Sequence, residues 1–425
     1  MHRTILKRKS VFIVSAVLLQ LEMFKERIIF SFIKHTKLYK RVGRIMLLAL
    51  IFLSSFQQSS SQGVDYAREL LDRLCSQEFH GRGYAFGSDK LVSEFIIKEL
   101  KKNKVKAFNK EYRQAFQINV NTLPGNNTVQ LDGSNLEPGI DFITSSFSPN
   151  ITGTYDIVRL NANIIDDSEK FRQFIQRDLS GKALLIDTIG IKRKDFSEGY
   201  NLILYRNVLK AKLVIRVEDK NLMYTPSQYA ADYALISIKR NALKSNPKKI
   251  SVDINAKFLK NYITNNVIGY IPGESDSAVV FTAHFDHIGH MGFETYFPGA
   301  NDNGSGVAML LNIAKLLSKE KYLKYTVIFM FFSAEELGLL GSKHYTENPV
   351  FPLEDIRFLI NLDMVGSGDD GIKVVNGSVL KEGLQLLSDL NFRNQYLPDV
   401  KTRGEAANSD HYFFYEKGVK SFFIY

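Results

Sequence analysis

Residues 279–290 read VVFTAHFDHIGH, an apolar run of strand length that passes directly into three histidines and an aspartate. Residues 279–284 have the composition of a buried β-strand. His284 and Asp286 are two residues apart, so on an extended backbone their side chains point to the same face. A neutral imidazole is a common zinc ligand, and a carboxylate beside it can fix its tautomer. The stretch therefore predicts a buried strand that ends in a metal-ligating group.

Three further apolar runs of strand length follow, at 326–332, 358–362 and 419–425. Between the strands expected at 279–284 and 326–332, apolar residues recur at helical spacing and mark one helix face: Val307, Leu310, Leu311, Ala314 and Leu317. Residues 64–102 also show helical spacing, with Phe95, Ile96, Ile97 and Leu100 on one face. Strands that alternate with amphipathic helices predict an α/β fold, with a mostly parallel mixed sheet flanked by helices.

Polar side chains that could bind a metal follow these strands. The glycine-rich loop 298–306 reads PGANDNGSG and contains Asp302, the strand 326–332 is followed by Ser-Ala-Glu335-Glu336, and the strand 358–362 is followed by Asp363. In open α/β sheets, ligands collect outside the carboxyl ends of the strands. Four separate segments therefore deliver His, Asp, Glu-Glu and Asp to the same edge of the predicted sheet.

Each of these features also has a simpler interpretation. A His-x-Asp pair or a strand-end acid can merely face water, and a Glu-Glu pair can begin a helix. The loop at 299–306 can be a helix N-terminus capped by Asp302 or Asn303. The remaining histidines are by default surface or supporting groups: His80, His287, His290 and His344. The ordered combination of all four segments favours the metal site.

Taken in order, five strings resemble the zinc metallopeptidase family of the bacterial leucyl aminopeptidases: FTAHFDHIG (281–289), PGANDNGSG (298–306), SAEELGLLG (333–341), NLD (361–363) and SDH (409–411). Glutamate carboxypeptidase II, the transferrin receptor and the glutaminyl cyclases are similar proteins. The resemblance covers 64–110 and 256–425. Residues 118–255 resemble the β-rich protease-associated domain that many members carry as an insertion, notably in GKALLI (181–186) and AKLVI (211–215).

The resemblance implies a co-catalytic two-zinc exopeptidase that acts on peptides, most simply an aminopeptidase. It assigns the metal ligands as His284, Asp302, Glu336 and Asp363. Asp302 would bridge the two zinc ions and precede a cis peptide bond, while Glu335 would be the general base.

Four further residues receive supporting roles from the same resemblance. Asp286 would be hydrogen-bonded behind His284. Asn303, Asp410 and His411 would lie near the substrate or behind the ligands.

The same resemblance leaves some questions open. The family's last zinc ligand follows the strand matched by 419–425, and this chain stops at Tyr425, so we expect a missing C-terminal end and one incomplete zinc site. A zinc carboxypeptidase or a glutaminyl cyclase could use the same scaffold. A non-catalytic, receptor-like relative would be expected to have lost metal ligands. A two-metal phosphatase would not explain the pair Glu335-Glu336.

The N-terminal segment 1–62 reads as a targeting segment. Basic residues Lys40, Arg41 and Arg44 precede an apolar run at 45–53, and small and polar residues follow, as in a secretory signal. Either Met1 or Met46 could be the start. We expect an exported protein, periplasmic or extracellular, with membrane association only if this segment stays as an uncleaved anchor.

Charge and cysteine content exclude other classes of protein. The net charge of +10 is concentrated in 1–62, which carry 11 Lys and Arg against two acids, whereas 63–425 carry 44 basic and 43 acidic residues. No nucleic-acid partner is therefore expected. The single cysteine, Cys75, excludes an intrachain disulfide framework. The expected organisation is a signal at 1–62, peptidase segments at 63–117 and 256–425, and an insertion at 118–255.

Overall fold

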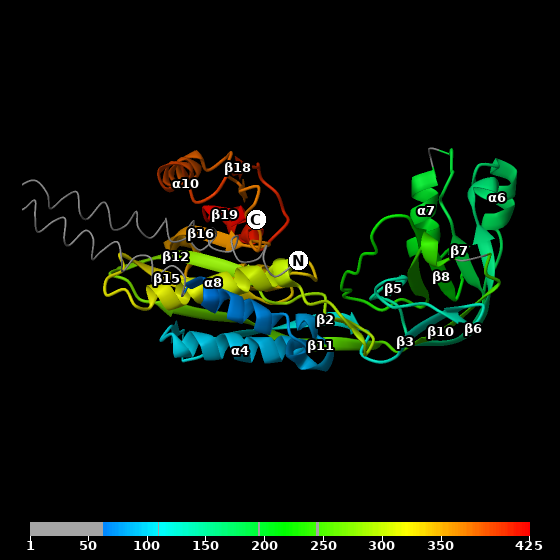
Figure 1. Ribbon diagram of the computed structural model, residues 1–425, viewed down its shortest axis with the longest axis horizontal. Coiled ribbons are helices and arrows are strands. Elements are labelled where there is room, and N and C mark those ends of the chain that lie inside the picture. Colours follow the sequence, from blue (N-terminus) through cyan, green and yellow to red (C-terminus); the bar gives the residue numbers. More distant parts are fainter. Residues whose placement is uncertain (1–62, 109, 194–195, 244–245) are drawn as a thin grey trace, which may run out of the picture.

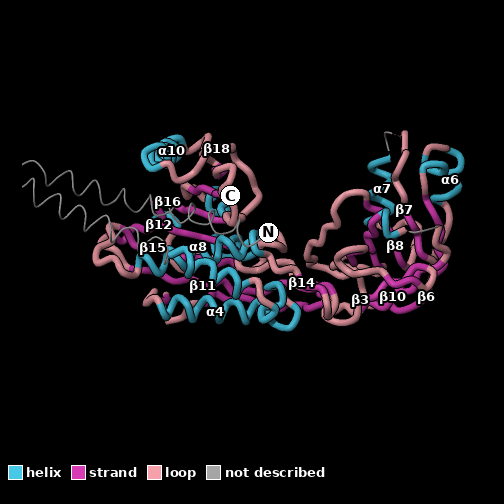
Figure 2. Tube along the Cα trace, viewed as in Figure 1, coloured by secondary structure: helices cyan, strands magenta, loops and turns pink. Residues whose placement is uncertain are grey.

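The computed structural model describes residues 63–425 except 109, 194–195 and 244–245, so the expected targeting segment at 1–62 lies outside the described residues. The chain forms two units, each built on its own β-sheet (Figures 1 and 2). Among the helices of the described residues, none is long and apolar enough to cross a membrane.

The larger unit holds a nine-stranded mixed sheet in the order β1-β11-β15-β12-β16-β19-β17-β18, with β2 also paired to β11. Its central strands β15, β12, β16 and β19 are parallel, and antiparallel pairings join β11 and β17 on either side. The prediction of an α/β fold with a mixed sheet is confirmed. The strands are β1 (Lys106–Ala107), β2 (Arg113–Thr122), β11 (Lys257–Ile271), β12 (Ser275–His284), β15 (Tyr325–Phe332), β16 (Ile356–Leu362), β17 (Ile372–Val375), β18 (Val400–Thr402) and β19 (Ser421–Ile424).

Helices cover both faces of this sheet because its central strands are apolar on both sides. In β15, Phe329 and Phe331 join the core on one face, whereas Ile328, Met330 and Phe332 join the core on the other. This alternation follows the two-residue period of a strand. The first face packs against residues 63–74, which are helical, and against α4 (Ser88–Lys102), α8 (Ser305–Leu317) and α10 (Lys381–Asn394). The second packs against α9 (Leu340–Glu347) and α11 (His411–Glu416).

The helical segment expected at 64–102 is interrupted in the structure. Its regular helix breaks at 75–87, where His80 and Arg82 adopt positive φ. The helical spacing of the apolar residues did not reveal this break. The pair Gly81 and Gly83 was the available signal, since glycines so close together disfavour a continuous helix.

The smaller unit holds an eight-stranded sheet in the order β4-β3-β10-β6-β7-β8-β9-β5. Of the range 118–255, residues 118–122 pair with β11 in the larger sheet, and 127–254 contain the smaller one. Its strands are β3 (Asn127–Leu131), β4 (Ser134–Asn135), β5 (Phe142–Thr144), β6 (Ile151–Leu160), β7 (Ala183–Ile186), β8 (Leu213–Glu218), β9 (Ala234–Lys239) and β10 (Lys249–Ile254). Its helices are α5 (Ala162–Ile165), α6 (Ser168–Ile175) and α7 (Phe196–Tyr205).

Short elements complete the fold. The hairpin of β13 (His290–Met291) and β14 (Thr295–Tyr296) follows β12. The short helical turns are η1 (Gln77–Arg82), η2 (Ala85–Gly87), η3 (Arg240–Ala242), η4 (Ala300–Gly304) and η5 (Leu353–Asp355).

The connection between β8 and β9, residues 219–233, reaches from the smaller unit to loops of the larger one. The Gln228 side chain donates a hydrogen bond to the carbonyl oxygen of Leu337 at 2.6 Å. The Tyr224 hydroxyl donates to the carbonyl oxygen of His290 at 3.3 Å. Both acceptors lie in segments that follow strands of the larger sheet, so the smaller unit contacts the carboxyl-end loops directly.

Replacing Leu310 by Ala should destabilise the larger unit, because Leu310 is fully buried on the face of α8 that packs against the sheet. A buried Leu→Ala change costs about 2–5 kcal/mol. Leu386→Ala on α10 is the matched control, since Leu386 is 40% exposed, and it should cost well under about 1 kcal/mol. Urea unfolding of both variants measures the two losses. Equal losses would contradict the packing described here.

Candidate metal centre

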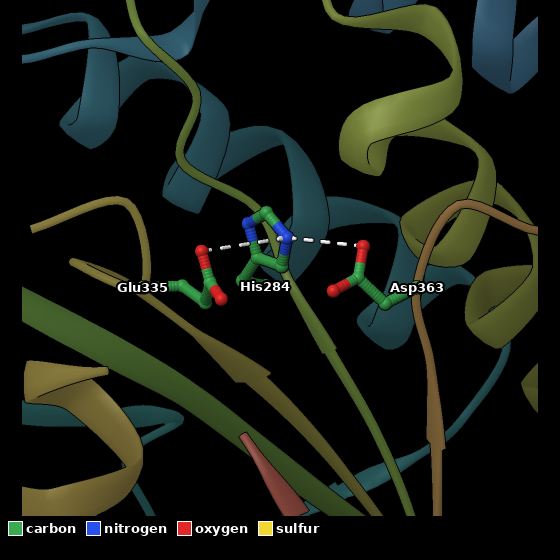
Figure 3. Close-up of side chains that lie close together, drawn as sticks. All are labelled: His284, Glu335 and Asp363. Carbon is green, nitrogen blue, oxygen red and sulfur yellow. Dashed lines mark hydrogen bonds and ion pairs between the residues drawn. The ribbon is translucent and has the colours of Figure 1, made fainter. Parts of the chain in front are cut away.

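The carboxyl ends of β12, β15 and β16 meet at one edge of the larger sheet. These strands are parallel and neighbours, with His284 at the level of Phe332 and Thr282 at the level of Asn361. The residues that follow each strand therefore emerge side by side. Figure 3 shows the result, with the His284 ring between the carboxylates of Glu335 and Asp363.

His284 is buried and its tautomer is fixed by the backbone. Its Nδ1 lies 3.2 Å from the carbonyl oxygen of Asp286, which can only accept, so Nδ1 carries the proton. Its Nε2 faces acids, at 3.3 Å from Oδ1 of both Asp302 and Asp363 and 3.9 Å from Oε2 of Glu335. This is the orientation that a metal-ligating histidine needs.

The Asp286 carboxylate binds the backbone of Glu335 and Glu336 rather than the imidazole ring of His284. Its carboxylate was expected to be hydrogen-bonded behind His284, but Oδ1 lies 3.8 Å from Nδ1 of His284. The carboxylate instead accepts the backbone N–H of Glu335 at 3.1 Å, the N–H of Glu336 at 3.3 Å and the Tyr84 hydroxyl at 3.1 Å. The contact to the ring comes from the carbonyl group of the same residue.

Among the residues that the structure describes, two groups of side chains could each hold a metal ion. One consists of His284, Glu335 and Asp363, and the other of His287, Asp302 and Glu336. Within each group the ligand atoms lie within 4.8 Å of one another. Imidazole nitrogens and carboxylate oxygens are zinc ligands, so both donor sets fit that metal.

The loop that carries Asp302 is tied to the end of β16 by Asn303. This buried amide donates to the carbonyl oxygen of Leu362 at 2.9 Å and accepts the N–H of Gly306 at 2.9 Å. A Cβ on Gly306 would lie 2.4 Å from both Asn303 Oδ1 and Leu362 O, so only glycine lets α8 begin this close to the strand. The Asp302–Asn303 peptide bond is cis, as expected.

A relay of three hydrogen bonds orients Asp363. Thr282 Oγ1 donates to Asn361 Oδ1 at 2.7 Å, Asn361 Nδ2 donates to Ser409 Oγ at 2.7 Å, and Ser409 Oγ donates to Asp363 Oδ2 at 2.8 Å. Oδ1 of Asp363 is thereby left to face His284. Ser409 of the SDH string thus acts on the site through Asp363.

The other two residues of that string are buried nearby. Asp410 lies close enough to Glu335, Asp363 and His284 to interact electrostatically with them. The ring of His411 packs against Phe423, with ring centroids 5.4 Å apart.

Acids exceed bases at this edge. The acids are Asp286, Asp302, Glu335, Glu336, Asp363 and Asp410, and beside them lie the imidazoles of His284 and His287 and the guanidinium of Arg82. Burial raises the pKa of Glu335 to about 9, that of Asp286 to about 7 and that of Asp410 to about 6. Bound cations relieve such crowding, so the charge balance also fits metal ions.

Arg82 is the buried cation that holds the loops of the site together. Its guanidinium donates five hydrogen bonds at 2.7–3.2 Å, all to backbone carbonyl oxygens, those of Leu74, Phe285, Pro298, Gly299 and Asp302. Residue 285 follows β12, and residues 298–302 form the loop of the expected bridging ligand. Sequence reasoning missed Arg82, because these two segments lie more than 200 residues away in the chain.

Residues 266–424 match the profile of Peptidase family M28. This part of the chain is similar to that family. The matched segment contains every residue of the two donor groups. The predicted resemblance is confirmed.

Relatives and solved structures agree with this family. Aminopeptidase YwaD of Bacillus subtilis is 27% identical over 228 residues, which cover 50% of this chain and 47% of the relative. An aminopeptidase of Pseudomonas aeruginosa is 38% identical over 136 residues, which cover 32% of this chain and 24% of the relative. The chain thus spans less than half the length of these relatives. The structure of BSAP, a zinc aminopeptidase from Bacillus subtilis, has the same fold, with a TM-score of 0.60, 22% identity and coverage of 85% of this chain and 84% of that one.

Replacing Arg82 by Met should strongly destabilise the protein. Met keeps much of the side-chain volume but leaves five carbonyl groups without their donor, a loss on the order of 3–5 kcal/mol. Arg73→Met is the control, because Arg73 is half-exposed and pairs with the exposed Glu78; it should cost less than about 1 kcal/mol. Guanidinium unfolding of both variants compares them, and similar small losses would show that Arg82 does not organise the loops.

Replacing His411 by Gln should make the free energy of unfolding less dependent on pH in acid. Burial lowers the pKa of His411 to about 4, below the value of about 6.5 for an unfolded chain. As pH falls from 6.5 to 4, the unfolded state takes up this proton first, so the folded state loses up to about 3 kcal/mol. The free energy of unfolding, measured from pH 7 to pH 4, should fall less steeply in the variant. Identical slopes would exclude a buried neutral His411.

Proposed function

We propose that this chain is a zinc exopeptidase that releases N-terminal residues from peptides, an aminopeptidase. The observation that carries the proposal is the convergence of five side chains from four separate segments at one sheet edge: His284, Asp302, Glu335, Glu336 and Asp363. The names of the relatives support a preference for a free amino end. The donor set supports zinc, as does the likeness to BSAP, which is a zinc aminopeptidase.

The proposed site would hold two zinc ions. His284 and Asp363 would hold one, Glu336 would hold the other, and Asp302 would be shared by both. The 3.3 Å distances from His284 to both aspartates, and the membership of Asp302 and Glu336 in one donor group, support this division. Zinc bound there would polarise the scissile carbonyl group and lower the pKa of a bound water.

Glu335 is proposed as the general base. It removes a proton from the water that attacks the carbonyl carbon, and it delivers that proton to the leaving nitrogen as the C–N bond breaks. A buried carboxyl group with a pKa of about 9 holds its proton at neutral pH. Positive charge beside it is needed to free the carboxylate for this role. The hydrogen bond from its N–H to Asp286 fixes its backbone at the site.

Export and the division into a peptidase with an inserted protease-associated-like domain are also proposed. The order of basic, apolar and small residues in 1–62 supports a secretory signal. The separate sheet of 127–254 supports an inserted unit. N-terminal sequencing of the protein recovered outside the cytoplasm would reveal a cleaved signal, and recovery of only uncleaved chain in the membrane would point to an anchor.

Hydrolysis of matched substrates tests the activity. We expect the zinc-loaded full chain to hydrolyse aminoacyl-nitroanilides and peptides with free amino ends, and to leave amine-blocked peptides intact. Activity on amine-blocked peptides with a free carboxyl end would instead indicate a carboxypeptidase. Release of ammonia from peptides that begin with glutamine would indicate a glutaminyl cyclase.

Glu335→Gln should lower turnover by about 100-fold or more, because an amide cannot act as a general base. The amide is close in size to the carboxyl group, so fold and zinc content should be kept. Glu347→Gln is the control, since Glu347 is exposed at the end of α9. Steady-state kcat of the zinc-loaded enzymes is the measurement. A Glu335→Gln variant as active as the control would remove Glu335 from the mechanism.

A further inference from the structure

His287 is placed to contact the metal centre, although neither the residue pattern nor the resemblance gives it a role. Its Nδ1 lies 2.7 Å from Oε1 of Glu336. With Asp302 these two residues form the second donor group, in which all ligand atoms lie within 4.8 Å of one another. One imidazole nitrogen and two carboxylates are a donor set that zinc accepts.

The backbones of the three residues in this group are held by Arg82 and by Asp286. The N–H of His287 donates to the carbonyl oxygen of Arg82 at 3.2 Å, and the Arg82 guanidinium donates to the carbonyl oxygen of Asp302 at 3.2 Å. The N–H of Glu336 donates to the Asp286 carboxylate at 3.3 Å. The backbones of all three donors are therefore fixed before any ion binds, as a metal site requires.

The neighbouring loop leaves room for the imidazole. A Cβ added to Gly299 would lie 2.4 Å from Cδ2 of His287 and 2.4 Å from Nη2 of Arg82. Gly299 also has a φ of +59°, a backbone angle that residues other than glycine rarely adopt. Because residue 299 has no side chain, the imidazole ring of His287 can pack against the loop that carries Asp302.

The exposure of the group suits a site that is reached from solvent. The side chains of His287 and Glu336 are 10% and 16% exposed, and that of Asp302 is 41% exposed. By contrast, the ring of His284 is 1% exposed. The second donor group therefore lies on the outer side of the first, where an ion can enter and a substrate can approach.

We propose that His287 is a ligand of the second zinc ion, binding through Nδ1 together with Glu336 and Asp302. This inference rests on the proposed function and adds an assignment to it. The hydrogen bond between His287 and Glu336 is exchanged for coordination when the ion binds. His287 is then the nitrogen donor of the outer site, as His284 is of the inner one.

Zinc titration of the metal-stripped full chain tests the assignment. Isothermal calorimetry with zinc alone, together with metal analysis after dialysis, should show two bound ions. His287→Ala should keep the inner site and weaken the outer one by about 100-fold or more. His290→Ala is the matched control, because His290 follows the same strand and its Nδ1 faces the carbonyl oxygen of Gly292. It should bind two ions like the wild type.

His287→Gln separates a ligand from a hydrogen-bond partner. Gln can still donate to Glu336 but is a poor zinc ligand, so it should bind the outer ion as weakly as His287→Ala. Cobalt-loaded protein gives a second readout, because each coordinated imidazole contributes a paramagnetically shifted, exchangeable ring N–H proton in the NMR spectrum. The wild type should show two such protons and both His287 variants one.

Three results would overturn the inference. If His287→Gln bound the outer zinc ion as tightly as the wild type does, His287 would only orient Glu336. Two tightly bound zinc ions in both variants would remove His287 from the site while leaving the proposed function intact. A wild-type chain that takes up no zinc and hydrolyses no peptide would end the proposed function itself. Circular dichroism of each variant confirms that it is folded.

Discussion

The buried guanidinium of Arg82 fixes the geometry on which the rest of the site depends. Its five donors reach carbonyl groups in three segments, so one side chain sets the distance between the end of β12 and the loop of Asp302. A planar fork of this kind can satisfy several acceptors at once. Because these five bonds all go to the backbone, the positive charge acts at a distance on the acids around it.

The acids around Arg82 explain why the site needs bound cations. Six carboxylates at one sheet edge would repel each other and resist burial unless positive charge joined them. The sheet brings them together because parallel neighbouring strands end at the same level. Asp286 then orients Glu335 and Glu336 by accepting hydrogen bonds from their N–H groups. Ser409 orients Asp363 by donating a hydrogen bond to its carboxylate. Fold and charge together favour bound cations.

The parts of this arrangement that depend on local patterns could be predicted from the sequence. Apolar runs at 279–284 and 326–332 are strands in the structure, and the polar residues that follow them meet as expected. Contacts between distant segments could not be predicted, because no periodicity encodes the strand order. Arg82 contacts carbonyl groups at 285 and 298–302, more than 200 residues away in the chain. The sequence predicts for His287 only a surface or supporting position, because its contact with Glu336 arises from the adjacency of β12 and β15.

The contacts of the segment 219–233 give the smaller unit a mechanical connection to the chemistry. Gln228 attaches to the backbone one residue beyond Glu336, and Tyr224 attaches three residues beyond His287. One connection of the smaller unit therefore contacts the outgoing loops of both β12 and β15. The placement of the smaller unit and the backbone that carries His287 and Glu336 are thus linked through two hydrogen bonds, so residues outside the metal centre contribute to the spacing of its donor atoms.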